Sequence, residues 1–179
     1  MMKILLTLTL TLTLAVLCQV GHADKGAIEV AKTHLDSNLK WNFKKLSETY
    51  APKVTLMPGH EFLKEEYGLA GAGGRDKGGE IDRDKLIAAM KKASADRRER
   101  PQERIDKLLK SLTYEVIETK EGDFATEASD PVGTPDGKLH FAIKKGDVLL
   151  KVAPPKGDFL LFHLRKKDGA WSVVSEYLD

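Results

Sequence analysis

The final stretch of the chain, 157-GDFLLFHLRKKDGAWSVVSEYLD-179, decides the fold class. Two apolar runs flank a charged segment that ends in an Asp-Gly pair, which is typical of tight turns between antiparallel strands. Side chains alternate between the faces of a strand, so Phe162 and Leu164 share one face and His163 lies on the other. Both runs place apolar residues on both faces. One face therefore fits a layer of helices, and the other fits a pocket wall, a dimer surface or ordinary exposed side chains.

The period of two continues upstream of this hairpin as far as residue 113. Each further run is bounded by Gly, Pro, Asp or Lys residues that favour turns, and the runs cover 113–119, 123–129, 138–145 and 147–153. Short alternating runs at regular spacing predict strands joined by hairpins. We therefore expect an antiparallel sheet assembled from consecutive hairpins.

The part of the chain before residue 113 has helical periodicity instead. Apolar residues at helical spacing predict helices over 25–39, up to about Tyr50, from a cap at Asp82 to about residue 92, and over 101–112. A short strand is expected at 54–57. Helices followed by strands are typical of an α+β domain whose helices cover one face of the sheet.

A glycine-rich segment at about 67–80 separates the expected short strand from the third helix. Closely spaced glycines can present backbone amides to a phosphate group. Here no buried strand leads into the segment, no Lys-Ser or Lys-Thr pair follows it, and no helix opens at its last glycine. We interpret it as a long loop, with a lid over a site as the open alternative.

Residues 1–23 are predicted to be a cleaved secretory signal peptide. A basic start is followed by a Leu- and Thr-rich apolar run, and small residues precede a polar segment at the expected cleavage position after Ala23. Lipidation at Cys18 is disfavoured because Leu17 stands where lipoprotein processing requires a small residue. We expect a secreted or periplasmic protein with no stable membrane span once the signal is removed.

Composition limits the organisation and the partners of the mature chain. Residues 24–179 contain no cysteine and are enough for one domain with its own core. The full chain has 29 Lys and Arg against 27 Asp and Glu, a net charge of +2. Nucleic-acid binding domains are usually strongly basic, so we expect no nucleic-acid partner.

The segments 45-KLSETYAPKVTLMPG-59 and 162-FHLRKKDGAWSVVSEYL-178 resemble the nuclear transport factor 2-like superfamily, including its polyketide cyclase-like and uncharacterised secreted branches. The resemblance covers nearly all of the single domain at 24–179. It implies a strongly curved, cone-like sheet around a pocket, with the last two strands in the wall. The glycine-rich loop and the charged helix over 101–112 depart from the family pattern, so the family's ligands are not carried over.

Five residues are candidates for lining such a pocket. His60 and Glu61 follow the Pro-Gly turn, which approaches the pocket in the resembling fold, and a local His and Glu pair can perform acid/base work. The aromatic candidates are Trp41, Tyr50 and Tyr114. No catalytic residue is identified. No paired-histidine helix motif or cysteine cluster is present, so we expect neither a metal nor a cofactor.

Three functional hypotheses follow from these observations. The first is an exported domain that binds a small molecule or a peptide in a pocket between the helices and the curved sheet. The second is a homodimeric interaction domain that works through its sheet face. The third is a small lyase, isomerase or hydrolase with a pocket carboxylate or histidine as general base. His34, on the first helix, is expected at the surface or half-buried, and the sequence does not decide whether the protein is an enzyme.

Overall fold

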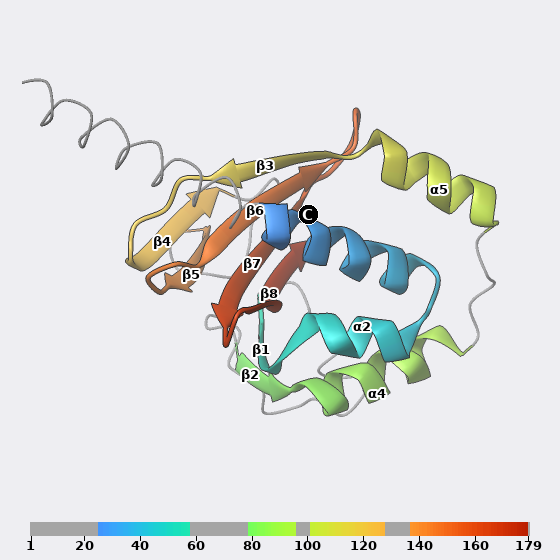
Figure 1. Ribbon diagram of the computed structural model, residues 1–179, viewed down its shortest axis with the longest axis horizontal. Helices are drawn as coiled ribbons and strands as arrows, with labels where there is room; N and C mark the ends of the chain where they lie inside the picture. Colours follow the sequence, from blue (N-terminus) through green and yellow to red (C-terminus); the bar gives the residue numbers. More distant parts are fainter. Residues whose placement is uncertain (1–24, 58–78, 96–100, 128–136, 179) are drawn as a thin grey trace, which may run out of the picture.

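The computed structural model describes residues 25–57, 79–95, 101–127 and 137–178 (Figure 1). A first helix spans residues 25–39. The other elements are α2 (Phe43–Thr49), β1 (Tyr50–Leu56), β2 (Gly79–Asp82), α4 (Arg83–Ser94), α5 (Gln102–Ser111), β3 (Thr113–Ile117), β4 (Gly122–Glu127), β5 (Lys138–Ile143), β6 (Val148–Ala153), β7 (Leu160–Lys167) and β8 (Ala170–Leu178). The α+β class and the helices predicted over 25–39 and 101–112 are confirmed to within a residue or two at their ends.

A curled six-stranded sheet forms the centre of the fold, in the order β2-β1-β8-β7-β6-β3. The predicted last hairpin is confirmed, since Lys167 pairs with Ala170 across the turn. The turn residues Asp168 and Gly169 have φ angles of 51° and 83°. Two positive φ values in succession are the requirement of a type I′ turn, which explains the Asp-Gly pair at this position.

The prediction of consecutive antiparallel hairpins is wrong in two respects. β4 and β5 pair with each other in a separate two-stranded sheet, and β3 pairs with β6 instead of β4. β1 lies beside β8 in parallel, with a shift of register between Tyr50 and Thr55. Alternation in a sequence marks a strand but not its neighbour, and the neighbours are set here by which apolar faces need to be covered.

The end of the glycine-rich segment also differs from the prediction. Gly79 and Glu80 belong to β2, which pairs antiparallel with β1, so these two residues lie in a strand. Asp82 stands at the N-cap position of α4 as expected, yet its side chain does not cap the helix. The Asp82 carboxylate instead forms an ion pair of 2.8 Å with Lys53 on the neighbouring strand.

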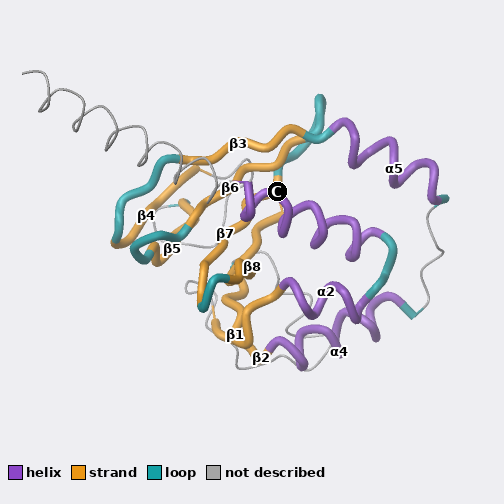
Figure 2. The backbone as a smooth tube through the Cα atoms, viewed as in Figure 1, coloured by secondary structure: helices purple, strands orange, loops and turns teal. Residues whose placement is uncertain are grey.

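The sheet is covered on both faces, as Figure 2 shows for the helices on one side and the β4-β5 hairpin at one end. Adjacent residues of β6 face different cores. Leu150 packs in the larger core with the helices, whereas Leu149 packs in a second core with Leu139 and Phe141 of β5. The apolar residues on both faces of the terminal hairpin are therefore explained by two cores, because Phe162 joins the first of them and Leu161 and Tyr177 the second.

Alanine substitutions at two neighbouring positions test this arrangement. Leu149 and Leu150 are both fully buried. Each substitution should lower the free energy of unfolding by about 2–5 kcal/mol, since each removes a buried side chain and leaves a cavity. Urea unfolding followed by circular dichroism measures both values. A loss below about 1 kcal/mol for Leu149→Ala alone would show that the hairpin does not cover this face.

Candidate functional site

A polar cluster lies between the first helix and the sheet. His34 projects from the first helix, Thr49 ends α2, Tyr50 begins β1, and Glu176 lies on β8. His34 has no exposed surface and Tyr50 is 2% exposed, whereas the Glu176 side chain is 21% exposed. The expectation that His34 lies at the surface or half-buried is wrong. Its position seven residues after Ala27 and three after Ala31 places it on the same inward stripe as these two residues and Leu35, which are also buried.

Hydrogen bonds fix the protonation of one nitrogen of His34. Thr49 Oγ1 donates its hydrogen to the backbone oxygen of Leu46 at 2.7 Å, because a carbonyl oxygen can only accept. His34 Nδ1 lies 2.7 Å from the same Oγ1, so Nδ1 carries a hydrogen and donates it. His34 Nε2 lies 2.9 Å from Glu176 Oε2. One further proton is therefore held between this nitrogen and this carboxyl oxygen.

The other oxygen of Glu176 accepts a hydrogen bond of 2.5 Å from the Tyr50 hydroxyl. Burial raises the pKa of Tyr50 well above its usual value, and the nearby Glu176 carboxylate adds to the rise. Tyr50 is consequently a neutral donor at all ordinary pH values. The His34 ring also meets Tyr50 and Phe162 edge to face, with centroids 4.6 Å and 5.3 Å apart. The cluster is thus a rigid link between the first helix, β1 and β8.

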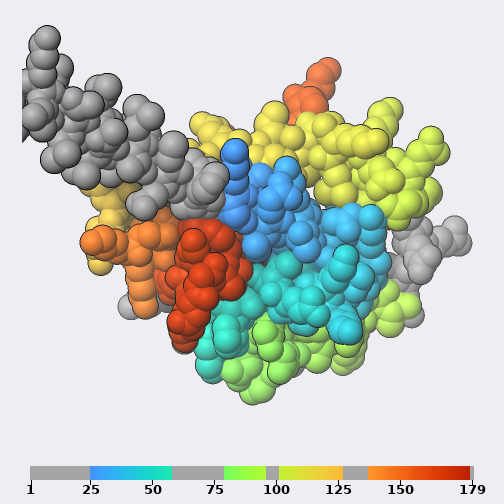
Figure 3. Space-filling view, viewed as in Figure 1, coloured from blue at the N-terminus to red at the C-terminus, as the bar shows by residue number. Residues whose placement is uncertain are grey.

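An open groove of about 340 Å³ lies on the outer side of the same helix. The first helix, α2, α5 and β3 together form its walls, and Figure 3 shows the surface between the blue first helix and the yellow-green α5 where it opens. Its lining residues are Lys32, Thr33, Asp36, Lys45, Leu109, Lys110 and Tyr114. Three lysines face one carboxylate in this set, so the groove is basic.

Helix α5 forms one wall of the groove, and few of its side chains are buried against the rest of the protein. Ile105 is its one fully buried residue, while Leu109 is partly buried and Leu108 is 37% exposed. Helical spacing predicted this helix, and the structure shows that only part of its apolar side is covered. The uncovered part places Leu109 and Lys110 at the groove, next to Tyr114 of β3.

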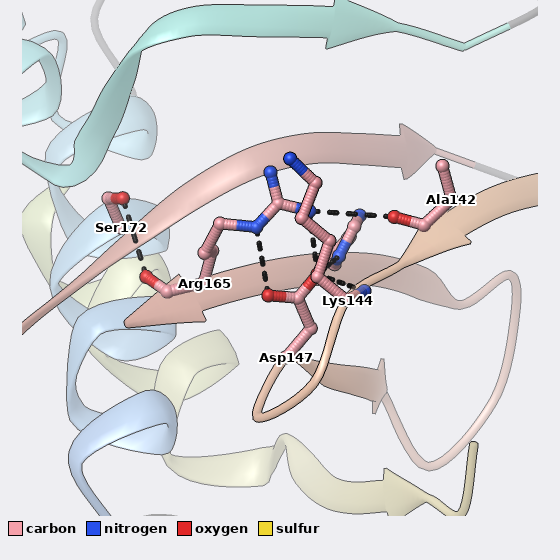
Figure 4. Close-up of polar contacts among 6 residues, drawn as sticks. Ala142, Lys144, Asp147, Arg165 and Ser172 are labelled. Atoms are coloured by element: carbon pink, nitrogen blue, oxygen red, sulfur yellow. Dashed lines mark hydrogen bonds and ion pairs between the residues drawn. The ribbon is translucent and has the colours of Figure 1, made fainter. Parts of the chain in front are cut away.

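A second polar cluster lies on the other face of the sheet, at the turn between β5 and β6 (Figure 4). The Asp147 side chain is only 1% exposed. Arg165 donates to both of its oxygens, from Nε at 2.9 Å and from Nη2 at 2.7 Å. His163 Nε2 and the backbone N–H of Lys144 lie 2.7 Å and 2.9 Å from Oδ2. With four donors on one buried carboxylate, this cluster fastens the turn to β7.

The pKa values in this cluster follow from burial and from these partners. Burial lowers the pKa of His163 and outweighs the opposite effect of Asp147, so His163 is neutral at pH 7 and donates from Nε2. Burial works to raise the pKa of Asp147, but Arg165, the Lys144 N–H and His163 together lower it. Both groups bind fewer protons in the folded state than in the unfolded state at acidic pH.

The three sequence candidates that the structure describes lie in different places. Tyr50 belongs to the buried cluster, and Tyr114 belongs to the groove. Trp41 lies in the turn after the first helix, at a φ of 59°, with its ring 6.4 Å from that of Phe43. His60 and Glu61 lie outside the described residues.

Glu176, Lys45 and Lys110 are not among the candidates predicted from the sequence. The position of Glu176 could have been singled out from β8, where it is the one charged residue of an otherwise uncharged strand. No local signal marked Lys45 and Lys110, because their proximity depends on how α5 lies against the first helix. Within the described ranges, no three His, Cys, Asp or Glu side chains are arranged to hold a metal ion.

A matched pair of substitutions at Glu176 tests the proton count. Glu176→Gln preserves both hydrogen bonds, since its amide oxygen accepts from Tyr50 and its NH₂ donates to a neutral His34. Glu176→Ala leaves two buried polar groups without partners, at a cost of about 3 kcal/mol in the free energy of unfolding. Urea unfolding of both variants should show the alanine variant as much the weaker. Equal losses would contradict the assignment of a single shared proton.

The free energy of unfolding should fall at acidic pH and again at strongly alkaline pH. The lowered pKa of His163 means that its contribution is present above pH 6.5 and is lost as the pH falls. The lowered pKa of Asp147 adds a second loss below about pH 3.8, and the raised pKa of Tyr50 adds a loss above about pH 10. Unfolding by urea across this range measures the profile. His163→Gln keeps a donor to Asp147 but does not titrate, so it should flatten the step between pH 7 and pH 5.

Comparisons with known proteins place few limits on this chain. No protein-family model matches it, and no curated protein does. Among solved structures it is similar to a protein of unknown function with a cystatin-like fold from Nostoc punctiforme, with a TM-score of 0.37 and 12% sequence identity over 86% of each chain. In the described part of the chain, no helix has the length and apolar character needed to cross a membrane.

Proposed function

We propose that the protein is an exported binding domain that takes a small molecule in the groove between its helices and its curved sheet. The observation that carries the proposal is the groove itself, because three helices and the edge strand β3 contribute side chains to one concave surface. Its volume of about 340 Å³ is at the lower end of the range for small-molecule sites. A nuclear transport factor 2-like fold, with a signal peptide at residues 1–23, is part of the same proposal.

Catalysis at the buried cluster has less support than binding in the groove. His34 has no exposed surface, and both of its ring nitrogens are engaged by Thr49 and Glu176. A general base must reach the proton that it removes. The described residues place the groove and this cluster on opposite sides of the first helix, so a ligand in the groove does not contact the imidazole.

Interaction through the sheet face also has less support. The second face carries the apolar residues Leu149, Leu161 and Tyr177, and these are buried in the core shared with β4 and β5. The hairpin therefore occupies much of the surface that a partner would need. A homodimer through another surface stays an alternative outcome of the experiment below.

Native mass spectrometry of the protein expressed with its own leader tests the proposal. The denatured mass should correspond to residues 24–179, and the native mass should exceed it by the mass of a bound molecule. Thr33→Trp places a large side chain in the groove and should abolish the excess mass. Glu103→Trp, on an exposed position of α5 outside the groove lining, serves as the matched control.

Other masses would contradict parts of this proposal. A dimer with no excess mass would favour the interaction hypothesis, and an excess mass that survives Thr33→Trp would place the ligand elsewhere. A denatured mass equal to that of the whole chain would contradict cleavage after Ala23.

A further inference from the structure

Among the described residues, some charged side chains around the groove form ion pairs within the protein, and others do not. Lys32 forms an ion pair of 2.8 Å with Glu29 on its own helix, and Asp36 forms one of 2.5 Å with Lys40. These four charges therefore cancel in pairs. In the part of the chain that the structure describes, no carboxylate forms an ion pair with the ammonium group of Lys45 or of Lys110. Two positive charges, from α2 and from α5, thus face the groove.

The remaining wall of the groove is apolar and partly aromatic. Leu109 and Tyr114 are partly buried and pack against the main core. Burial raises the pKa of Tyr114, and Glu29 adds to the rise, so the phenol stays neutral and its ring can contact an apolar ligand. Lys32 Nζ lies 5.5 Å from the centroid of that ring, which holds the ring in place from one side.

From these two observations we infer that the groove binds a small anion with a flat apolar body, such as an aromatic sulfonate, carboxylate or phosphate ester. Lys45 and Lys110 bind the anionic group, and Leu109 and Tyr114 contact the apolar body. The volume of the groove suits a small molecule better than a peptide segment. This inference rests on the proposed function and names the ligand class for the same site.

Two fluorescent probes that differ in one group test the charge requirement. Anilinonaphthalene sulfonate carries an anionic group on two aromatic systems, and N-phenylnaphthylamine has the same skeleton without a charge. Fluorescence titration of the folded protein should give tighter binding of the sulfonate. Its affinity should fall between about 0.01 M and about 1 M salt, since the Debye length decreases from roughly 30 Å to roughly 3 Å. The affinity of the neutral probe should not fall.

Charge-removing variants connect this preference to the two lysines. Lys45→Gln with Lys110→Gln should weaken binding of the sulfonate by about tenfold and leave the neutral probe unchanged, because two partly exposed ion pairs are lost. Lys145→Gln, in the turn at the opposite end of β6 from the groove, removes one charge elsewhere and should change neither affinity. Tyr114→Ala should weaken both probes. Circular dichroism confirms that each variant is folded.

The outcomes separate the ligand class from the proposed function. Equal binding of both probes, reduced by Tyr114→Ala and unaffected by the lysine variants, would overturn the anion inference and keep a binding groove. Binding of an acidic peptide with no binding of the sulfonate would overturn the small-molecule class. Binding of neither probe, together with no excess mass in the native protein, would overturn the proposed function as well. An unchanged sulfonate affinity in the double lysine variant would place the anion at another surface.

Discussion

The fold depends on satisfying one histidine that has no contact with solvent. Because His34 is fully buried, both of its nitrogens must find partners inside the protein, and these partners come from α2 and β8. Glu176 in turn binds Tyr50 at the start of β1. The first helix, the short second helix, the parallel strand β1 and the central strand β8 are therefore held in one relative position. The curled sheet and the helix layer both take their alignment from this position.

The two sides of the first helix have different roles as a result. Its inner side supplies Ala27, Ala31 and His34 to the interior. Its outer side supplies Lys32, Thr33 and Asp36 to the groove. A rigid inner attachment gives the groove one fixed wall, while α5, anchored through Ile105, supplies a wall that is less firmly held.

The sequence predicted the helices and strands better than it predicted which strands pair with one another. Alternation and helical spacing located the first helix, α5 and the last hairpin, since these signals depend on residues close together in the chain. The separate β4-β5 sheet, the short strand β2 and the parallel pairing of β1 with β8 depend on contacts between distant segments, and no local pattern specifies them. The same reason explains which residues of the groove and of the buried cluster could be predicted. Tyr114 could be named from its chemistry, whereas His34 and Glu176 are 142 residues apart and meet only through the sheet.

The position of β8 has a consequence for the order of folding. β8 is an interior strand of the six-stranded sheet, and its Glu176 carboxylate bonds to a tyrosine 126 residues earlier. The core around His34 cannot close before β8 has joined the sheet, and contacts of such long sequence separation form slowly. We therefore expect the local elements, such as the first helix and the β7-β8 hairpin, to form before the interior around His34 is sealed.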